Sequence, residues 1–369
     1  MRILVAGDYC PQYRIAETIE EEKYDSIFEE AKYLFSLADY SIVNLECPVS
    51  SGDTKPIDKI GPNLRCTRRG IEALKWAGVD CVALANNHFL DYDAGGALET
   101  IETLDAMGID HVGGGMNLAE AANVLYKSIG NKRVAIINCC EHEFSIATET
   151  TAGSNPLNPV QQFYTIKEAK LNADKVLVIV HGGHEHFQLP SLRMTETYRF
   201  FIDAGADVVV NHHQHCFSGY EVYKGKLIFY GLGNFCFDNP EKRSGIWTEG
   251  YAVIVNFDSD HPAFTLHPYC QCADKPCVRL LEDNAFENKL KELNGIIADS
   301  SALCKAIENY YDSCAEQCSN LFEPIRNRYY LGAKRRGWLP SLISKERRLL
   351  LANFIVCESH YDKVKRYLK

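Results

Sequence analysis

The sequence predicts an α/β fold for residues 1–280 and a helical extension for residues 281–369. Up to about residue 280, short apolar runs of strand length alternate with segments that have the apolar spacing of an amphipathic helix. Beyond that point the helical spacing continues without strand-like runs. With 369 residues, 46% of them hydrophobic and 24% charged, the chain is long enough for one large domain and an appendage.

Five apolar runs in the first part predict buried strands, and polar residues follow each of them. In chain order they are 3–6 with Asp8, 41–45 with Glu46, 79–85 with Asn87 and His88, 176–180 with His181, and 208–211 with His213 and His215. Helical spacing is found at 20–38, 67–77, 95–106 and 196–204, and in the extension at 286–299, 302–318 and 345–357. A hairpin is expected at 123–138 and two closing strands at 251–257 and 264–269.

Three histidines after the last apolar run are the most informative feature of the sequence. His212, His213 and His215 are interrupted only by Gln214. Crowded imidazoles next to a buried strand each need a hydrogen-bond partner or a metal. In extended backbone, residues two apart point the same way, so His213 and His215 are expected on one side. This favours a metal site, with three hydrogen-bonded surface histidines as the alternative.

The polar residues at the other strand ends each have a structural explanation when taken alone. Asp8 and Asn87 are of the types that cap helices. Glu46 suits solvent, and a single His181 suits a hydrogen-bonded core position. Together they indicate more, because an open α/β sheet gathers the carboxyl ends of its strands at one edge. Carboxylates, an amide and imidazoles there predict a site for one or two divalent ions, Mn, Zn, Fe or Mg.

Several motifs occur in this part of the chain. They are Asn44-Leu45-Glu46-Cys47-Pro48, Ala85-Asn86-Asn87-His88 with Asp91, His181-Gly182-Gly183-His184-Glu185, His212-His213-Gln214-His215 and Tyr230-Gly231-Leu232-Gly233-Asn234-Phe235. In this order they resemble the CapA family of poly-γ-glutamate capsule-synthesis proteins, which belongs to the calcineurin-like metallophosphoesterase superfamily. The resemblance runs from Asp8 to about Asp238 and does not cover the helical extension.

The resemblance implies a four-layer α/β/β/α metallophosphoesterase-like sandwich, with its site at the carboxyl ends of the strands. It assigns six residues to metal binding, namely Asp8, Glu46, Asn87, His181, His213 and His215. Glu46 takes the bridging position between two metals. Asn87, His181 and His213 complete one metal site, and Asp8 and His215 belong to the other.

The resemblance also implies the chemistry of the site. His88, next to Asn87, lies beside the metals as the proton donor or a substrate contact. A metal pair can polarise a phosphoryl or carbonyl oxygen and supply hydroxide near neutral pH. His88 and Asn87 are therefore the predicted catalytic residues.

The chain departs from the superfamily pattern at its first motif. The superfamily has Asp-x-His there, whereas Asp8-Tyr9-Cys10 places a thiol at the imidazole position. Cys10 either binds metal as a thiolate or leaves a weakened site that holds its ion loosely. The bridging residue is Glu46 instead of the superfamily's usual Asp, so the number of ions, one or two, is open.

Lys59 and Arg193 are the basic residues predicted to bind the substrate. A guanidinium presents a fork that suits carboxylate or phosphate, and an ammonium attracts the same groups as a point charge. The expected ligand is an anionic small molecule or polymer precursor. Solvated surface charge is the alternative for each residue.

Charge is distributed unevenly along the chain. The formal net charge is −10, yet residues 326–369 contain 12 Lys and Arg against three acidic residues, which leaves −19 for residues 1–325. The acidic body argues against nucleic-acid binding. The basic tail, with Trp338 and the apolar run 349–356, suits a membrane surface, a capsule synthase, or the acidic body of the same chain.

Fifteen cysteines, with no apolar export segment before the first strand, predict reduced thiols and a cytoplasmic protein whose contact with a membrane is peripheral. Cys270, Cys272 and Cys277 are clustered, but their spacing matches no common zinc site, and structural thiols are expected.

These observations predict a metal-dependent hydrolase of a phosphoester or amide bond. Through the family resemblance, they link it to the biosynthesis of a capsule or a polymer of the poly-γ-glutamate type. The alternative is a non-catalytic assembly factor that binds a polyanion or a synthase on the same fold. The altered first motif favours this alternative.

Overall fold

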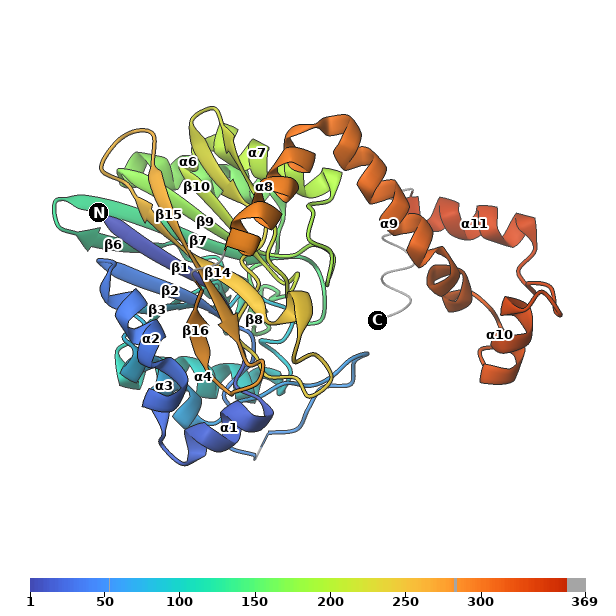
Figure 1. Ribbon diagram of the computed structural model, residues 1–369, viewed down its shortest axis with the longest axis horizontal. Helices are drawn as coiled ribbons and strands as arrows, with labels where there is room; N and C mark the ends of the chain where they lie inside the picture. Colours follow the sequence, from blue (N-terminus) through green and yellow to red (C-terminus); the bar gives the residue numbers. More distant parts are fainter. Residues whose placement is uncertain (53, 282–283, 357–369) are drawn as a thin grey trace. The chain divides into compact units, whose positions relative to one another are not determined.

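The computed structural model describes residues 1–52, 54–281 and 284–356. The chain forms two compact units, Met1–Leu303 and Cys304–Lys369. The first unit contains two large sheets and the helices that cover them (Figure 1). The second unit is helical in the part that the structure describes.

The first sheet has the order β16-β15-β14-β1-β2-β3-β4, and β13 pairs with the end of β1. Its parallel strands are β1 (Arg2–Tyr9), β2 (Tyr40–Leu45), β3 (Cys81–Ala83), β4 (Asp110–Val112) and β13 (Asn234–Cys236). Its antiparallel strands are β14 (Glu249–Asn256), β15 (Ala263–Gln271) and β16 (Val278–Leu280). The carboxyl ends of β1, β2 and β3 therefore share one edge.

The second sheet has the order β11-β12-β10-β9-β7-β6. Its parallel strands are β7 (Lys132–Cys140), β9 (Lys175–His181), β10 (Val208–His212) and β12 (Lys226–Phe229). Its antiparallel edge strands are β6 (Leu125–Ile129) and β11 (Tyr220–Tyr223). The hairpin predicted at 123–138 is confirmed as β6 and β7. A small sheet pairs β5 (Gly114–Gly115) with β8 (Gly153–Ser154).

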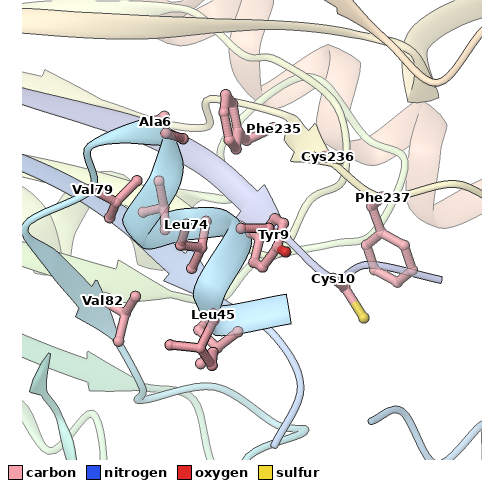
Figure 2. Close-up of a cluster of buried hydrophobic side chains, with 14 of the residues drawn as sticks. Ala6, Tyr9, Cys10, Leu45, Leu74, Val79, Val82, Phe235, Cys236 and Phe237 are labelled. Carbon is pink, nitrogen blue, oxygen red and sulfur yellow. The ribbon is translucent and has the colours of Figure 1, made fainter. Parts of the chain in front are cut away.

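Side-chain alternation along the central strands explains how the layers pack. Leu4 and Ala6 of β1 face the core shared with the helices, whereas Ile3 and Val5 are buried on the opposite face. Figure 2 shows the helix-side core, with Leu74 of α3 among strand side chains. The helices on this side are α1 (Tyr13–Glu20), α2 (Tyr24–Ser36), α3 (Arg68–Ala77) and α4 (Asp93–Met107).

Two further helices, α6 (Pro159–Asn172) and α7 (Leu192–Ala204), pack on the second sheet. Both faces of the central strands of each sheet are thus buried, as their continuous apolar runs require. The predicted four-layer α/β/β/α sandwich is confirmed. Short helical turns also occur at α5 (Leu118–Ala121) and η1 (Gly245–Trp247).

Several predicted elements have different bounds in the structure, and two of these differences have a clear physical cause. The helix expected at 20–38 is α2, which begins only at Tyr24, because Glu22 adopts a left-handed conformation (φ 58°) and separates it from α1. The strand expected at 79–85 is shorter, because Ala85 leaves the ladder and its N–H donates to Asn138 Oδ1 of the second sheet at 2.7 Å.

The first unit continues past the predicted boundary at residue 280, because α8 (Asn284–Ala298) packs on it. The ring of Phe286 lies 4.7 Å from that of Phe217, and Asn294 Oδ1 accepts a hydrogen bond from the Tyr220 N–H at 2.8 Å. The later helices are α9 (Ser300–Leu321), α10 (Arg328–Arg335) and α11 (Lys345–Val356).

Cys357, the last residue of the final predicted helix, lies outside the described residues. Among the helices that the structure describes, none combines the length and the apolar character needed to cross a membrane.

Candidate metal centre

The six predicted metal ligands meet where the two sheets present their strand ends. Asp8 lies in β1, Glu46 follows β2, and Asn87 follows β3. His181 ends β9, and His213 and His215 come directly after β10. Each of the six is buried, with at most 7% of its surface exposed. Residues as far apart in the sequence as Asp8 and His215 thus converge, as the strand-end pattern predicted.

Glu46, His181 and His213 form the first set of ligands, here called the His213 group. One ligand atom from each lies within 4.8 Å of the others. His181 Nε2 is 3.0 Å from His213 Nδ1 and 3.6 Å from Glu46 Oε1. Asn87 Oδ1 lies 3.0 Å from the same His181 nitrogen and extends the group to four possible donors.

Asp8, Glu46 and His215 form the second set, the His215 group, which satisfies the same distance limit. His215 Nε2 lies 3.5 Å from Glu46 Oε1, and its Nδ1 is 3.0 Å from Asn234 Oδ1. An Nδ1–H donated to Asn234 leaves Nε2 as the ligating nitrogen. Glu46 belongs to both groups, which is the bridging position that the resemblance implies.

These residues fit a divalent cation. Both carboxylate oxygens of Glu46 are buried without a hydrogen-bond partner among the described residues. An orphaned buried carboxylate is costly unless a cation compensates it. Metal bonds of about 2.0–2.2 Å place neighbouring ligand atoms roughly 3.0–3.5 Å apart, close to the separations in the His213 group. Carboxylate, amide and imidazole donors suit Mn, Zn, Fe or Mg.

The pKa shifts of these residues also fit a metal site. Burial and the charge of Asp8 raise the pKa of Glu46 well above its ordinary value. Burial would also raise the pKa of Asp8, but the contact with His212 and the charge of His215 bring it below its ordinary value. Burial and the neighbouring imidazoles hold the pKa of His181 well below 6.5, and burial lowers the pKa of His215 to about 4. Neutral imidazole is the form that binds metal.

The backbone after β10 is not extended. The prediction that His213 and His215 point to one side assumed an extended strand, and that assumption is wrong. Both adopt left-handed conformations, with φ 88° and 54°. A positive φ is unusual for residues with a side chain and marks local strain. The turn sends His213 to one ligand group and His215 to the other, an outcome that spacing alone does not reveal.

Close backbone contact positions Asp8. A Cβ on Gly7 would lie 1.9 Å from the carbonyl oxygen of Gly233, which itself has φ 79°. The Asp8 N–H donates to that oxygen at 3.2 Å, and β13 pairs Asp8 with Asn234. The close approach of Gly7 and Gly233 therefore brings the Asn234 side chain beside His215.

Two further polar residues, not assigned to the site from the sequence, lie beside the ligands, and Asn44 contacts a member of each group. Asn44 Nδ2 donates to Asp8 Oδ1 at 2.8 Å and lies 3.3 Å from His181 Nδ1. His212 Nδ1 lies 3.3 Å from the same Asp8 oxygen. Strand alternation could have indicated Asn44, because it is two residues from Glu46 and shares its side of β2.

His88, the predicted proton donor, is anchored from one side. Its Nδ1 lies 2.6 Å from Asp91 Oδ2 and 3.1 Å from Lys59 Nζ, and Lys59 also pairs with Asp91. Asp91 Oδ2 further accepts from the Leu64 N–H at 2.6 Å. Asp91 thus holds both the His88 ring and the loop that carries Lys59.

Both residues predicted to bind substrate already have carboxylate partners. The side chain of Lys59 is buried and pairs with Asp91, whereas the guanidinium of Arg193 is exposed and lies 2.7 Å from Glu141. A substrate anion would compete with these partners for either cation.

The thiol of Cys10 lies away from the ligands. Cys10 and Tyr9 belong to the helix-side hydrophobic core (Figure 2), and Gln12 Nε2 lies 3.5 Å from the Cys10 sulfur. Burial raises the pKa of Cys10, which keeps it a thiol. Of the two alternatives for the first motif, the structure favours the loosely held site. Cys272, from the later cluster, is buried beside Cys236.

Comparison with known proteins identifies the family. The model of the bacterial capsule synthesis protein family PGA_cap matches residues 2–239. The capsule biosynthesis protein CapA of Bacillus anthracis is 33% identical over 252 residues, which cover 66% of this chain and 61% of that protein. The PGA biosynthesis protein CapA of Bacillus subtilis (strain 168) is 34% identical over 242 residues, 64% of this chain and 63% of that protein.

The chain thus spans about three fifths of the length of these relatives. Among solved structures, a 5'-nucleotidase precursor from Thermus thermophilus aligns with 85% of this chain and 59% of its own, at 13% identity and a TM-score of 0.43. The family match covers both sheets' strand ends and all six candidate ligands. The resemblance predicted from the motifs is confirmed, and the chain belongs to the bacterial capsule synthesis protein family PGA_cap.

Proposed function

We propose that this chain is a metal-dependent hydrolase of a phosphoester or amide bond in an anionic metabolite or polymer precursor, acting in capsule or poly-γ-glutamate type biosynthesis. The observation that carries the proposal is Glu46, a fully buried carboxylate whose two oxygens lack hydrogen-bond partners among the described residues and face imidazoles from the second sheet. A divalent ion held there supplies polarisation of a phosphoryl or carbonyl oxygen.

The protein's own residues would orient the substrate and move the proton. His88 lies next to Asn87, and Asp91 fixes its ring through Nδ1. With that nitrogen occupied, Nε2 is the atom that donates a proton to the departing group. The residue is 8% exposed, so the donor is shielded from bulk water without being sealed from solvent.

The test is metal analysis of the purified full chain together with hydrolysis of bis(4-nitrophenyl) phosphate and γ-glutamyl-4-nitroanilide. His213→Ala should lose bound metal and at least about 100-fold in activity, because it removes a ligand. His111→Ala is the matched control, since His111 lies in β4 of the first sheet and its side chain contacts Asp105 of α4 instead of the ligands. Metal-free wild type with full activity on either probe would contradict the proposal.

A second candidate is a non-catalytic assembly factor that binds a nascent polyanion or a synthase on this fold. The orientation of Cys10 away from the ligands favours it, because the His215 group then lacks one of the superfamily's donors. Tight binding of poly-γ-glutamate without turnover, unchanged in His88→Ala, would decide for this function. Turnover that His88→Ala abolishes would decide against it.

The second unit supports a further proposal, contact with the cytoplasmic face of an anionic membrane. Residues 326–356 contain eight Lys and Arg but only one acidic residue. Arg336 stacks on Trp338, which is 73% exposed, and Leu349 and Leu350 of α11 are also exposed. Basic residues beside exposed aromatic and aliphatic side chains suit the interface of an anionic bilayer.

Flotation of the full chain with phosphatidylcholine vesicles, with and without phosphatidylglycerol, tests this contact. Binding should require phosphatidylglycerol, weaken with salt and disappear in the double variant Arg347→Glu/Arg348→Glu. Lys224→Glu, in the first unit, is the control. If the chain binds neither vesicle but binds a capsule synthase through the same residues, the partner of this surface is that protein and not a lipid.

A further inference from the structure

A lysine that neither the motifs nor the family comparison identifies lies beside the His215 group. Lys242 follows β13 in the segment that leads to Trp247. Its Nζ lies 2.7 Å from His186 Nε2 and 4.4 Å from the centroid of the Trp247 ring. Trp247 in turn packs on His215, with ring centroids 4.9 Å apart. One aromatic ring therefore separates this amine from a candidate metal ligand.

Lys242 differs from the other cations near the centre in the charge of its partners. Lys59 pairs with Asp91, and Arg193 pairs with Glu141. Arg14 and Arg243 both pair with the buried Asp238, at 2.8 and 3.0 Å. In the part of the chain that the structure describes, the amine of Lys242 makes no ion pair with a carboxylate.

The partners of Lys242 are instead an imidazole and an indole. The imidazole nitrogen that accepts from an ammonium must carry its lone pair, so it offers one acceptor and no negative charge. The indole face attracts the cation but takes up none of its N–H groups. Glu185 reaches the same imidazole at 3.8 Å but lies outside ion-pair distance of the amine. The ammonium keeps N–H donors available for an anion.

The backbone of His186 is a second observation. His186 adopts φ 62°, a left-handed conformation that is unfavourable for a residue with a side chain. Its N–H donates to the Gln214 carbonyl at 2.8 Å, which ties this strained residue to the turn carrying His213 and His215. Strain of this kind persists where the surrounding structure enforces it and is concentrated at functional sites.

We propose that Lys242, positioned by His186 and Trp247, forms an anion subsite next to the metal centre. It binds a carboxylate or phosphate group of the substrate that is adjacent to the bond being cleaved, and so selects substrates that carry a second negative charge there. The inference rests on the proposed function only in that the bound anion belongs to its substrate; binding of the anion itself requires no turnover.

The test is calorimetric titration of the metal-loaded full chain with two probes, inorganic phosphate and the dicarboxylate glutarate. Lys242→Met should weaken binding of the preferred probe about 10- to 100-fold, because it removes a charge-assisted hydrogen bond. Lys242→Arg should restore most of it. Metal content should be unchanged in both variants, because Lys242 supplies no metal ligand. Lys224→Met, an exposed lysine paired with Asp203, is the matched control.

The probe that loses affinity identifies the group as phosphate or carboxylate. Wild-type affinity of Lys242→Met for both probes, in a variant with wild-type thermal unfolding, would overturn the inference. Equal weakening in Lys224→Met would overturn it as well, since the effect would then be one of overall charge. If binding depends on Lys242 but no hydrolysis occurs, the proposed function is wrong and the subsite stands. If hydrolysis occurs but Lys242→Met binds both probes as the wild type does, the proposed function stands and the subsite is wrong.

Discussion

The His213 group and the His215 group share Glu46 but differ in how completely the protein supplies their ligands. The first has a carboxylate, two imidazoles and the Asn87 amide, taken from the ends of both sheets. The second has two carboxylates and one imidazole, and Cys10, at the position of the missing donor, faces the core. We therefore expect the first group, with four possible donors, to hold an ion more tightly than the second, with three.

Removing the shared residue should have the largest effect. Glu46→Ala is expected to empty both groups and lower hydrolysis of bis(4-nitrophenyl) phosphate by about 1,000-fold or more, because the ion contributes several kcal/mol of transition-state stabilisation. Metal content by mass spectrometry and initial rates would measure it, with His111→Ala as control. Retention of one ion per chain would show that the groups do not share Glu46.

Removing one histidine from each group tests whether the two groups differ in metal affinity. His213→Ala should abolish binding of the tightly held ion, whereas His215→Ala should remove only the weakly held one. A loss of about 100-fold or more is expected for the first, and a smaller loss for the second. Titration of the apo protein with Mn²⁺ gives the stoichiometry of each variant. Equal affinities of the two sites in the wild type would remove the distinction.

Asn44 links the groups, so its loss should affect both. Asn44→Leu keeps the side-chain size but removes the amide that contacts Asp8 and His181. Metal affinity should fall about 10- to 100-fold, as is usual when a group that orients ligands is removed. The same titration measures it. If the affinity for only one of the two ions falls, Asn44 orients only one of its two neighbours.

The pH dependence of the metal-free protein tests the environment of His215. Its pKa in the folded protein is about 4, against 6.5 for an exposed histidine, so the unfolded chain takes up the proton first. Its contribution to stability is present above pH 6.5 and is lost as the pH falls toward 4, by up to about 3 kcal/mol.

Urea unfolding at pH 7 and pH 5 would measure this loss, and His215→Asn should have a shallower dependence than the wild type. The difference between the two proteins isolates His215 from Glu46, whose raised pKa acts in the opposite direction. Parallel curves for wild type and His215→Asn would mean that His215 is not buried as a neutral imidazole.

The smallest effect on metal binding is expected at Cys10. Cys10→Ala should leave metal content unchanged and lower the free energy of unfolding by about 1–2 kcal/mol, because a buried thiol is replaced by a small cavity. Absorption spectra of the Co²⁺-loaded protein should show no thiolate-to-metal charge transfer in either form. Such a band in the wild type, lost in Cys10→Ala, would place Cys10 in the His215 group.

Local patterns were sufficient to predict the α/β class and the five strand ends with their polar residues, and the family resemblance assigned six of those residues to metal binding. An apolar run of strand length followed by a polar residue can be recognised over a few positions, and parallel strands bring their carboxyl ends together in any such sheet. Asp8, Glu46 and His181 were found in this way, and their motifs also identified the family.

Only the tertiary structure decided the orientation of Cys10, the left-handed turn that separates His213 from His215, the extent of the first unit through α8, and the uncharged partners of Lys242. Each depends on packing between segments that are distant in the sequence. A strand can carry a side chain to either face, and a lysine can pair with any carboxylate within reach. The partner that is present depends on how the whole chain folds.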